Sequence, residues 1–303
     1  MQIKDIDRAS NIDWSKAKVG IANAGGSLKG VAFHTGFYKA LLDYNLEPEI
    51  IVGTSAGAII GQYIALYGVN ETSLNQLDKI VVNLTADDYI DRLSKLTIAW
   101  RLIRAGRGLS GYIKGERLED FIREIGQYNS FDNLKKIKFG AHVANLTRRR
   151  QEILTEGDLA AAARASATIP LVFQPVKIQN QWYVDGGVFG YHAADHLLDI
   201  HPDLDVIIVV DFHLNDEEPS EFMGNKWVVK DIVQRCLDSQ AHEYEKLKFE
   251  LITHKNKDVV LVNIRPKIPV SINLLKPDKK TLRRIIDVSY NEASNLLYNI
   301  ING

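Results

Sequence analysis

The stretch Ile50-Ile51-Val52-Gly53-Thr54-Ser55-Ala56-Gly57-Ala58 decides the fold. Its first three residues are β-branched and apolar, which predicts a short buried strand. Small and apolar residues from 58 to 66 predict a helix directly after it. The turn between them carries the pattern Gly53-x-Ser55-x-Gly57, in which glycines let the backbone pass close to its neighbours. Such a turn presents a serine hydroxyl at the head of a helix, where developing negative charge is favoured.

Ser55 also has a purely structural interpretation. Serine is a good N-cap, because its hydroxyl can accept a hydrogen bond from an amide in the first turn of a helix. The local pattern therefore predicts either a nucleophile or a helix cap at Ser55.

A second glycine turn lies upstream. An apolar strand expected at 19–22 leads into Gly25-Gly26-Ser27-Leu28-Lys29-Gly30, and a helical pattern follows. A loop of this kind can bind phosphate or an oxyanion through its amides, or it can be a tight structural turn. It fits neither the dinucleotide fingerprint, because of Ser27, nor the phosphate-loop pattern, because of Val31.

Strand, glycine turn and helix thus occur twice within 70 residues, which predicts a mostly parallel central sheet flanked by helices. Further strands are expected at 139–146, 151–154, 182–184, 206–210 and 259–264, and further helices at 160–166, 228–249 and 282–301. Residues 70–127 contain no strand-like run and are interpreted as an inserted helical cap. Residues 1–16 form a polar lead-in. Without a linker or repeat, residues 1–303 are expected to form a single domain.

Composition excludes several classes of protein. The 303 residues include 37 Lys+Arg and 38 Asp+Glu, and the net charge of -1 argues against a general nucleic-acid binder. The single cysteine, Cys236, excludes an intramolecular disulfide and a cysteine-clustered metal site. No apolar run approaches the roughly 18 residues of a spanning helix. Residues 1–13 lack the apolar core of a signal peptide, so a cytoplasmic protein is expected.

A third motif, Asp185-Gly186-Gly187, follows the strand expected at 182–184. An aspartate at such a strand end can accept a proton from a nucleophile. Asp-Gly is also an ordinary turn dipeptide, so the motif alone supports both interpretations.

Together and in this order, the three motifs resemble those of the patatin-like phospholipase family. The family's pattern is a Gly-Gly-Gly-x-Lys/Arg-Gly loop, then Gly-x-Ser-x-Gly, then Asp-Gly-Gly/Ala. Two further segments match: Ala165-Ser166-Ala167-Thr168-Ile169-Pro170 with Phe173 and Pro175, and Gly108-Leu109-Ser110-Gly111 with Leu118 and Phe121. The resemblance covers about residues 18–196 well and the remainder only in outline.

The resemblance implies a patatin-like three-layer α/β/α fold and a serine lipid acyl hydrolase of phospholipase A or lysophospholipase type. Ser55 would be the nucleophile and Asp185 the base of a Ser-Asp dyad that works through an acyl-enzyme. The amides of Gly25 and Gly26 would form the oxyanion hole, and Lys29 would lie near the lipid phosphate. The remaining motif positions are Gly30, Gly53, Gly57, Gly186 and Gly187. Neither a metal nor an organic cofactor is implied.

The loop departs from the family's pattern at Ser27, where the family usually has glycine. A positive φ there would cost a serine on the order of 1 kcal/mol. This departure keeps open a lipid-binding protein with weakened catalysis. A second alternative is a thioesterase or acyltransferase that uses the same residues. A third is an α/β-hydrolase triad completed by a histidine after Asp185, with His192 the nearest in sequence.

Two segments of the chain are rich in basic residues. Residues 92–117 carry seven basic side chains and one acidic one, a net charge of +6, interleaved with apolar residues and Trp100. This composition suits docking of the cap on an anionic lipid surface, and it also suits a solvated basic face. Arg148-Arg149-Arg150 is interpreted as a solvated hairpin tip, with a lipid-headgroup contact as the alternative. The pattern does not give the oligomeric state.

Overall fold

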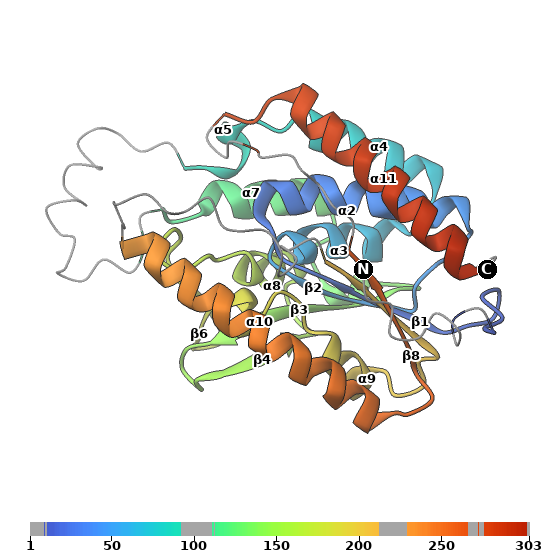
Figure 1. Cartoon of the computed structure of the whole chain (residues 1–303). Helices are drawn as coiled ribbons and strands as arrows, with labels where there is room; N and C mark the ends of the chain where they lie inside the picture. Colours follow the sequence, from blue (N-terminus) through green and yellow to red (C-terminus); the bar gives the residue numbers. More distant parts are fainter. Residues whose placement is uncertain are drawn as a thin grey trace, which may run out of the picture.

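The computed structural model describes residues 9, 11–91, 111, 113–211, 229–265, 272 and 276–301. Within them, helices cover both faces of one central sheet (Figure 1). The strand order is β5-β6-β3-β2-β1-β7-β8, with β4 paired to β3. The five neighbours from β3 to β8 run parallel, and β4 and β6 run antiparallel to β3. The expected mostly parallel sheet flanked by helices is therefore confirmed.

The strands lie close to their expected positions. They are β1 (Val19–Asn23), β2 (Ile50–Thr54), β3 (Lys138–Asn145), β4 (Arg150–Leu154), β5 (Val176–Ile178), β6 (Gln181–Asp185), β7 (Val206–Val210) and β8 (Val260–Ile264). Only the three-residue β5 has no counterpart among the expected strands. Its alternating exposure gives it no continuous apolar run.

The helices are α2 (Ser27–Asp43), α3 (Ala56–Tyr67), α4 (Glu71–Val82), α5 (Ala86–Tyr89), α7 (Glu116–Gly126), α8 (Leu159–Ser166), α9 (Leu197–Ile200), α10 (Val229–Lys255) and α11 (Lys279–Ile301). Three 3-10 turns accompany them: η1 (Phe131–Asn133), η2 (Gly186–Phe189) and η3 (Ala194–His196). Of the helices in the described residues, none combines the length and apolar character that a bilayer crossing requires.

The expected cap, residues 70–127, is helical where it is described, in α4, α5 and α7. Residues 92–110 and 112 lie outside the described residues, and with them most of the basic segment. The prediction of one domain over the whole chain stays a prediction.

The apolar strands are buried on both faces, as parallel strands covered by helices usually are. Successive residues of β1 alternate between two cores: Ile21 packs on the side of α2, α3 and α11, and Ala22 on the side of α9 and α10. Figure 1 shows α10 and α9 below the sheet and α2, α4 and α11 above it. Helices therefore cover both faces of the sheet, and a reactive site can form only at the ends of the strands.

The pairing of β3 brings two distant turns together. Thr54 of β2 pairs with His142, and the next residue of β3, Val143, pairs with Asp185 of β6. Because β4 pairs with β3 along the same stretch, β2 and β6 must share the opposite edge of β3. The two strands meet there end to end. The turn after Thr54 and the carboxyl end of β6 therefore lie side by side.

Candidate active site

Ser55 occupies the sharp turn between β2 and α3, with φ 54° and ψ −119°. A non-glycine residue in this region carries strain of about 1–3 kcal/mol, which the surrounding structure must hold in place. The two motif glycines explain how the turn packs. A Cβ at Gly53 would come within 2.5 Å of Ala58, and one at Gly57 would come within 2.5 Å of the Asn23 carbonyl. Side chains at these positions would force the turn apart.

The interpretation of Ser55 as a helix cap is wrong. Its side chain makes no capping hydrogen bond to α3. Instead its hydroxyl lies close enough to the Asp185 carboxylate to lower the pKa of that carboxyl. Ser55 and Asp185 retain only 7% and 5% of their exposure. The structure therefore brings together the two residues that the sequence singled out for nucleophilic chemistry.

Asp185 ends β6 and begins the turn η2. Its carboxylate accepts a hydrogen bond from the Gly187 amide at 2.8 Å. Gly186 is pressed against His142, whose carbonyl would lie 2.5 Å from a Cβ at Gly186. Burial raises the pKa of Asp185 to about 6, although the bonds from Gly187 and Ser55 act in the opposite direction. A carboxyl with this pKa can take up a proton near neutral pH.

Ser166 is a site residue whose role the sequence did not reveal. Its hydroxyl accepts a hydrogen bond from the Ser55 amide at 2.9 Å and donates one to the His142 carbonyl at 2.6 Å. Ser166 is fully buried at the end of α8. It ties the strained turn to β3. The only sequence signal was its place in the Ala-Ser-x-x-x-Pro segment.

The residues after Ser166 hold Asp185. The Asp185 amide donates to the Thr168 carbonyl at 2.9 Å. The Thr168 hydroxyl accepts from the buried Arg164 guanidinium, which also donates to the carbonyls of Lys114 and Gly115. Burial lowers the pKa of Arg164 to about 10. One helix end thus holds the backbones of both Ser55 and Asp185.

The glycine-rich loop passes beside the Ser55 side chain, because a Cβ at Gly25 would lie 3.3 Å from the Ser55 Cβ. The Gly25 amide donates to the Tyr191 carbonyl at 2.9 Å. Among the described residues, the amides of Gly26 and Ser27 have no acceptor. Ser27 adopts φ 53°, the positive angle at which serine is strained.

α2 begins at Ser27, three residues earlier than the expected end of the loop. Lys29 and Gly30 therefore lie in the first turn of α2 and not in the loop itself. Lys29 is half-buried there, and Gly30 is buried with its amide bonded to the Gly26 carbonyl. The N-terminus of α2, like that of α3, is close to Ser55 and favours negative charge there.

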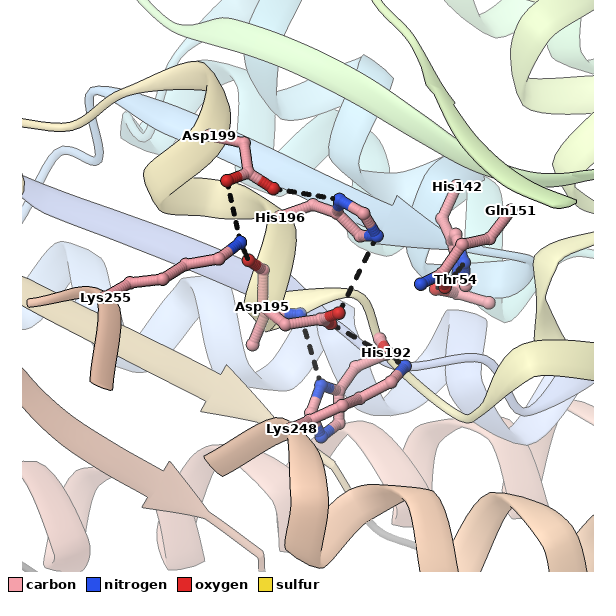
Figure 2. Close-up of polar contacts among 10 residues, drawn as sticks. Thr54, His142, Gln151, His192, Asp195, His196, Asp199, Lys248 and Lys255 are labelled. Carbon is pink, nitrogen blue, oxygen red and sulfur yellow. Dashed lines mark hydrogen bonds and ion pairs between the residues drawn. The ribbon is translucent and has the colours of Figure 1, made fainter. Parts of the chain in front are cut away.

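The structure does not bring His192 to the dyad. Figure 2 shows His192 beside Lys248 and Asp195, apart from the group formed by Thr54, His142 and Gln151. Burial lowers the pKa of His192 to about 3, so its ring is neutral. The carboxylate of Asp185 has only Gly187 and Ser55 as partners in the described part of the chain. A triad histidine is absent from these residues, and His213 lies outside them.

The residues around His192 hold the chain segment that binds the glycine-rich loop. Lys248 of α10 donates to the His192 carbonyl and lies 3.8 Å from the carboxylate of Asp195. The preceding carbonyl, that of Tyr191, holds Gly25. The described residues contain no group of three or more His, Cys, Asp or Glu side chains that could hold a metal ion.

A cleft of about 490 Å³ lies away from the dyad, where α2 and α3 end. Its lining includes Leu46, Leu66 and Lys136. Leu66 is ten residues along α3 from Ala56, roughly 15 Å at the helical rise. This cleft therefore does not belong to the Ser55–Asp185 site.

The chain is similar to proteins of known sequence and structure. It is 26% identical over 192 residues to the uncharacterised protein YqhO of Bacillus subtilis (strain 168), covering 54% of this chain and 62% of that protein. It is 24% identical over 221 residues to lysophospholipase nte1 of Aspergillus fumigatus, covering 68% of this chain and 13% of that protein. The chain thus spans less than two thirds of either relative. The crystal structure of VipD from Legionella pneumophila matches with a TM-score of 0.47 and 14% identity, covering 93% of this chain and 67% of that chain.

The family itself follows from a broader match. The profile of the patatin-like phospholipase family matches residues 21–197, more than half of the chain. This range contains all three motifs and every residue described around Ser55 and Asp185 except Lys248. The chain belongs to the patatin-like phospholipase family.

Proposed function

We propose that this protein is a serine lipid acyl hydrolase in which Ser55 is the nucleophile and Asp185 the base. One observation carries the proposal: a buried carboxyl with a pKa of about 6 lies beside the hydroxyl of a serine held in a strained turn. Family membership and the lysophospholipase among its relatives support an acyl ester of a lipid as the substrate.

In the first half-reaction the Ser55 oxygen attacks the ester carbonyl, and its proton passes to Asp185. The tetrahedral intermediate expels the alcohol, a lysolipid or a glycerol derivative, which takes the proton from Asp185. Ser55 is left as an acyl ester. In the second half-reaction Asp185 removes a proton from water, which attacks this ester. The fatty acid leaves, and the proton returns to Ser55.

The oxyanion of each intermediate is proposed to bind at the loop that passes beside Ser55. The amides of Gly26 and Ser27 support this because neither has an acceptor among the described residues. Gly25 contributes by shape, since its amide is engaged by Tyr191 and a side chain there would crowd Ser55. The N-termini of α2 and α3 add favourable dipoles. Lys29 is proposed to attract the lipid phosphate from the first turn of α2.

The test is hydrolysis of phospholipid, lysophospholipid and soluble aryl esters by the protein and by two variants, Ser55→Ala and Asp185→Asn. Both variants are expected to lose at least about a thousandfold in kcat, because the dyad acts as a unit. Full activity in either variant would overturn the mechanism. Adding an acyl thioester and an acyl acceptor to the panel separates an ester hydrolase from a thioesterase or acyltransferase.

A further inference from the structure

The hairpin between β3 and β4 projects beyond the dyad. β3 continues three residues past His142, which is level with Thr54, and this extends the hairpin by roughly 10 Å. β6 and β5 pair alongside, and Figure 1 shows this part of the sheet standing out beside α10. The projection therefore borders the end of the sheet at which Ser55 and Asp185 lie.

Within the described residues, one face of this projection is exposed at its outer end. Val143 and Tyr183 turn toward Ala165 of α8 and form a small core with it. Residues on the other face alternate with them. There Leu146 and Trp182 remain 48% and 46% exposed, in neighbouring positions joined by the bond from the Leu146 amide to the Trp182 carbonyl. A tryptophan and a leucine side by side in water are unfavourable unless a partner covers them.

Basic side chains lie beside Trp182 and at the tip of the hairpin. Lys177 lies over the Trp182 ring, 5.8 Å from its centroid. The exposed tip of the hairpin carries three arginines, Arg148, Arg149 and Arg150. Within residues 145–154 and 176–183 the only acidic residue is Glu152, which pairs with Arg148 and Arg150 on the face of Val143. The net charge of this surface is +3 in a chain whose total is -1.

We infer that this surface, the hairpin patch of Leu146, Arg148, Arg149, Arg150, Lys177 and Trp182, docks the protein on an anionic lipid bilayer. Tryptophan settles at the level of the headgroups, leucine adds apolar burial, and the cations meet the negative surface. The inference rests on the proposed lipid substrate and adds where the protein meets it. It differs from docking through the basic segment 92–117, of which the structure describes little.

The position of the patch agrees with this role. Trp182 and Asp185 are three residues apart on β6, roughly 10 Å at the rise of a strand. The polar layer of a bilayer is about 5–8 Å thick on each side. With Trp182 among the headgroups, Asp185 would lie within roughly 10 Å of them, on the protein side.

The experiment measures binding to vesicles of phosphatidylcholine with and without phosphatidylglycerol, using Ser55→Ala protein so that the lipid stays intact. We expect binding to the anionic vesicles only, and weaker binding in high salt. Arg149→Glu with Lys177→Glu, and separately Leu146→Ser with Trp182→Ser, should each weaken binding about tenfold or more. All four side chains are exposed, so the fold should tolerate the changes.

The matched controls are Arg284→Glu and Tyr298→Ser, which change an exposed cation and an exposed aromatic on α11. They should bind as the parent does. Equal binding by the patch variants and the parent, or no binding of the parent to anionic vesicles, would overturn the inference.

Hydrolysis of a soluble aryl ester separates this inference from the proposed function. Loss of vesicle binding with intact ester hydrolysis in patch variants that carry Ser55 supports the docking surface. Ester hydrolysis without any vesicle binding refutes the docking surface and still supports the proposed hydrolase activity. Vesicle binding through the patch without ester hydrolysis refutes the hydrolase and leaves the docking surface standing.

Discussion

The Ser166 hydroxyl accepts a hydrogen bond from the backbone amide of Ser55 at 2.9 Å and donates one to the carbonyl of His142. A side chain at the end of α8 therefore holds the backbone of Ser55 in its strained conformation. A buried amide without an acceptor would cost about 1–3 kcal/mol. Ser166 is for this reason a positioning residue, which acts on the reaction through the orientation of Ser55.

Ser166→Ala should lower kcat about ten- to a hundredfold and leave KM nearly unchanged, because the turn loses its support while the lipid contacts persist. The rate of labelling by a fluorophosphonate should fall in parallel. Ser166→Cys, which keeps a weak donor and acceptor, should recover part of the loss.

Ser289 provides the control. It is also fully buried, and its hydroxyl donates to the Phe33 carbonyl at 2.6 Å, but it does not contact Ser55. Ser289→Ala should lose a similar free energy of unfolding without a matching loss of kcat. An equal fall of kcat in both variants would show that Ser166 contributes only stability.

The rate should depend on the ionisation of Asp185. The base works as a carboxylate, and its pKa is about 6. The value of kcat/KM should therefore be flat well above this pH and fall about tenfold per unit below it. A pH–rate profile on a soluble ester measures the midpoint. A midpoint near 3.8, the ordinary value for aspartate, would contradict the buried, raised pKa.

The same pKa predicts a change in stability. The folded carboxyl titrates at about 6 and the unfolded one near 3.8, so the folded state loses stability as the pH rises between them. Asp185→Asn removes this penalty. It should raise the free energy of unfolding by on the order of 2–3 kcal/mol above pH 6 and leave it unchanged below pH 3.8. Urea unfolding at both ends of the range tests this, and a destabilised variant at high pH would contradict it.

Ser27 is predicted to carry strain rather than chemistry. Its φ of 53° suits glycine, so Ser27→Gly should stabilise the fold by up to about 1 kcal/mol and keep the activity. Gln127→Gly, at φ 50° on the end of α7, should stabilise similarly and serves as the control. A large loss of activity in Ser27→Gly alone would show that the serine side chain takes part in the reaction.

Much of this arrangement was predictable because it depends on local patterns. The apolar runs of β1, β2, β7 and β8 gave the parallel sheet, and the glycines at 53 and 57 gave the turn at Ser55. The short strand β5 escaped prediction because its exposure alternates over only three residues.

The supporting contacts could not be predicted, because they join residues far apart in the sequence. Ser166 lies 111 residues from Ser55 in the sequence. The residues next to Ser166 do not indicate which amide donates a hydrogen bond to its hydroxyl. The Gly25 amide likewise looked free in sequence, while the fold brings the Tyr191 carbonyl to it. These contacts form only when the distant segments pack together in the folded chain.

The central claim is that Ser55 is the nucleophile, and covalent labelling tests it most directly. The protein would be treated with a fluorophosphonate, and the modified peptide would be identified by mass spectrometry. The account predicts one adduct, on Ser55, absent from Ser55→Ala and slowed in Asp185→Asn. Undiminished labelling of Ser55→Ala, or an adduct on another serine of the native protein, would contradict it.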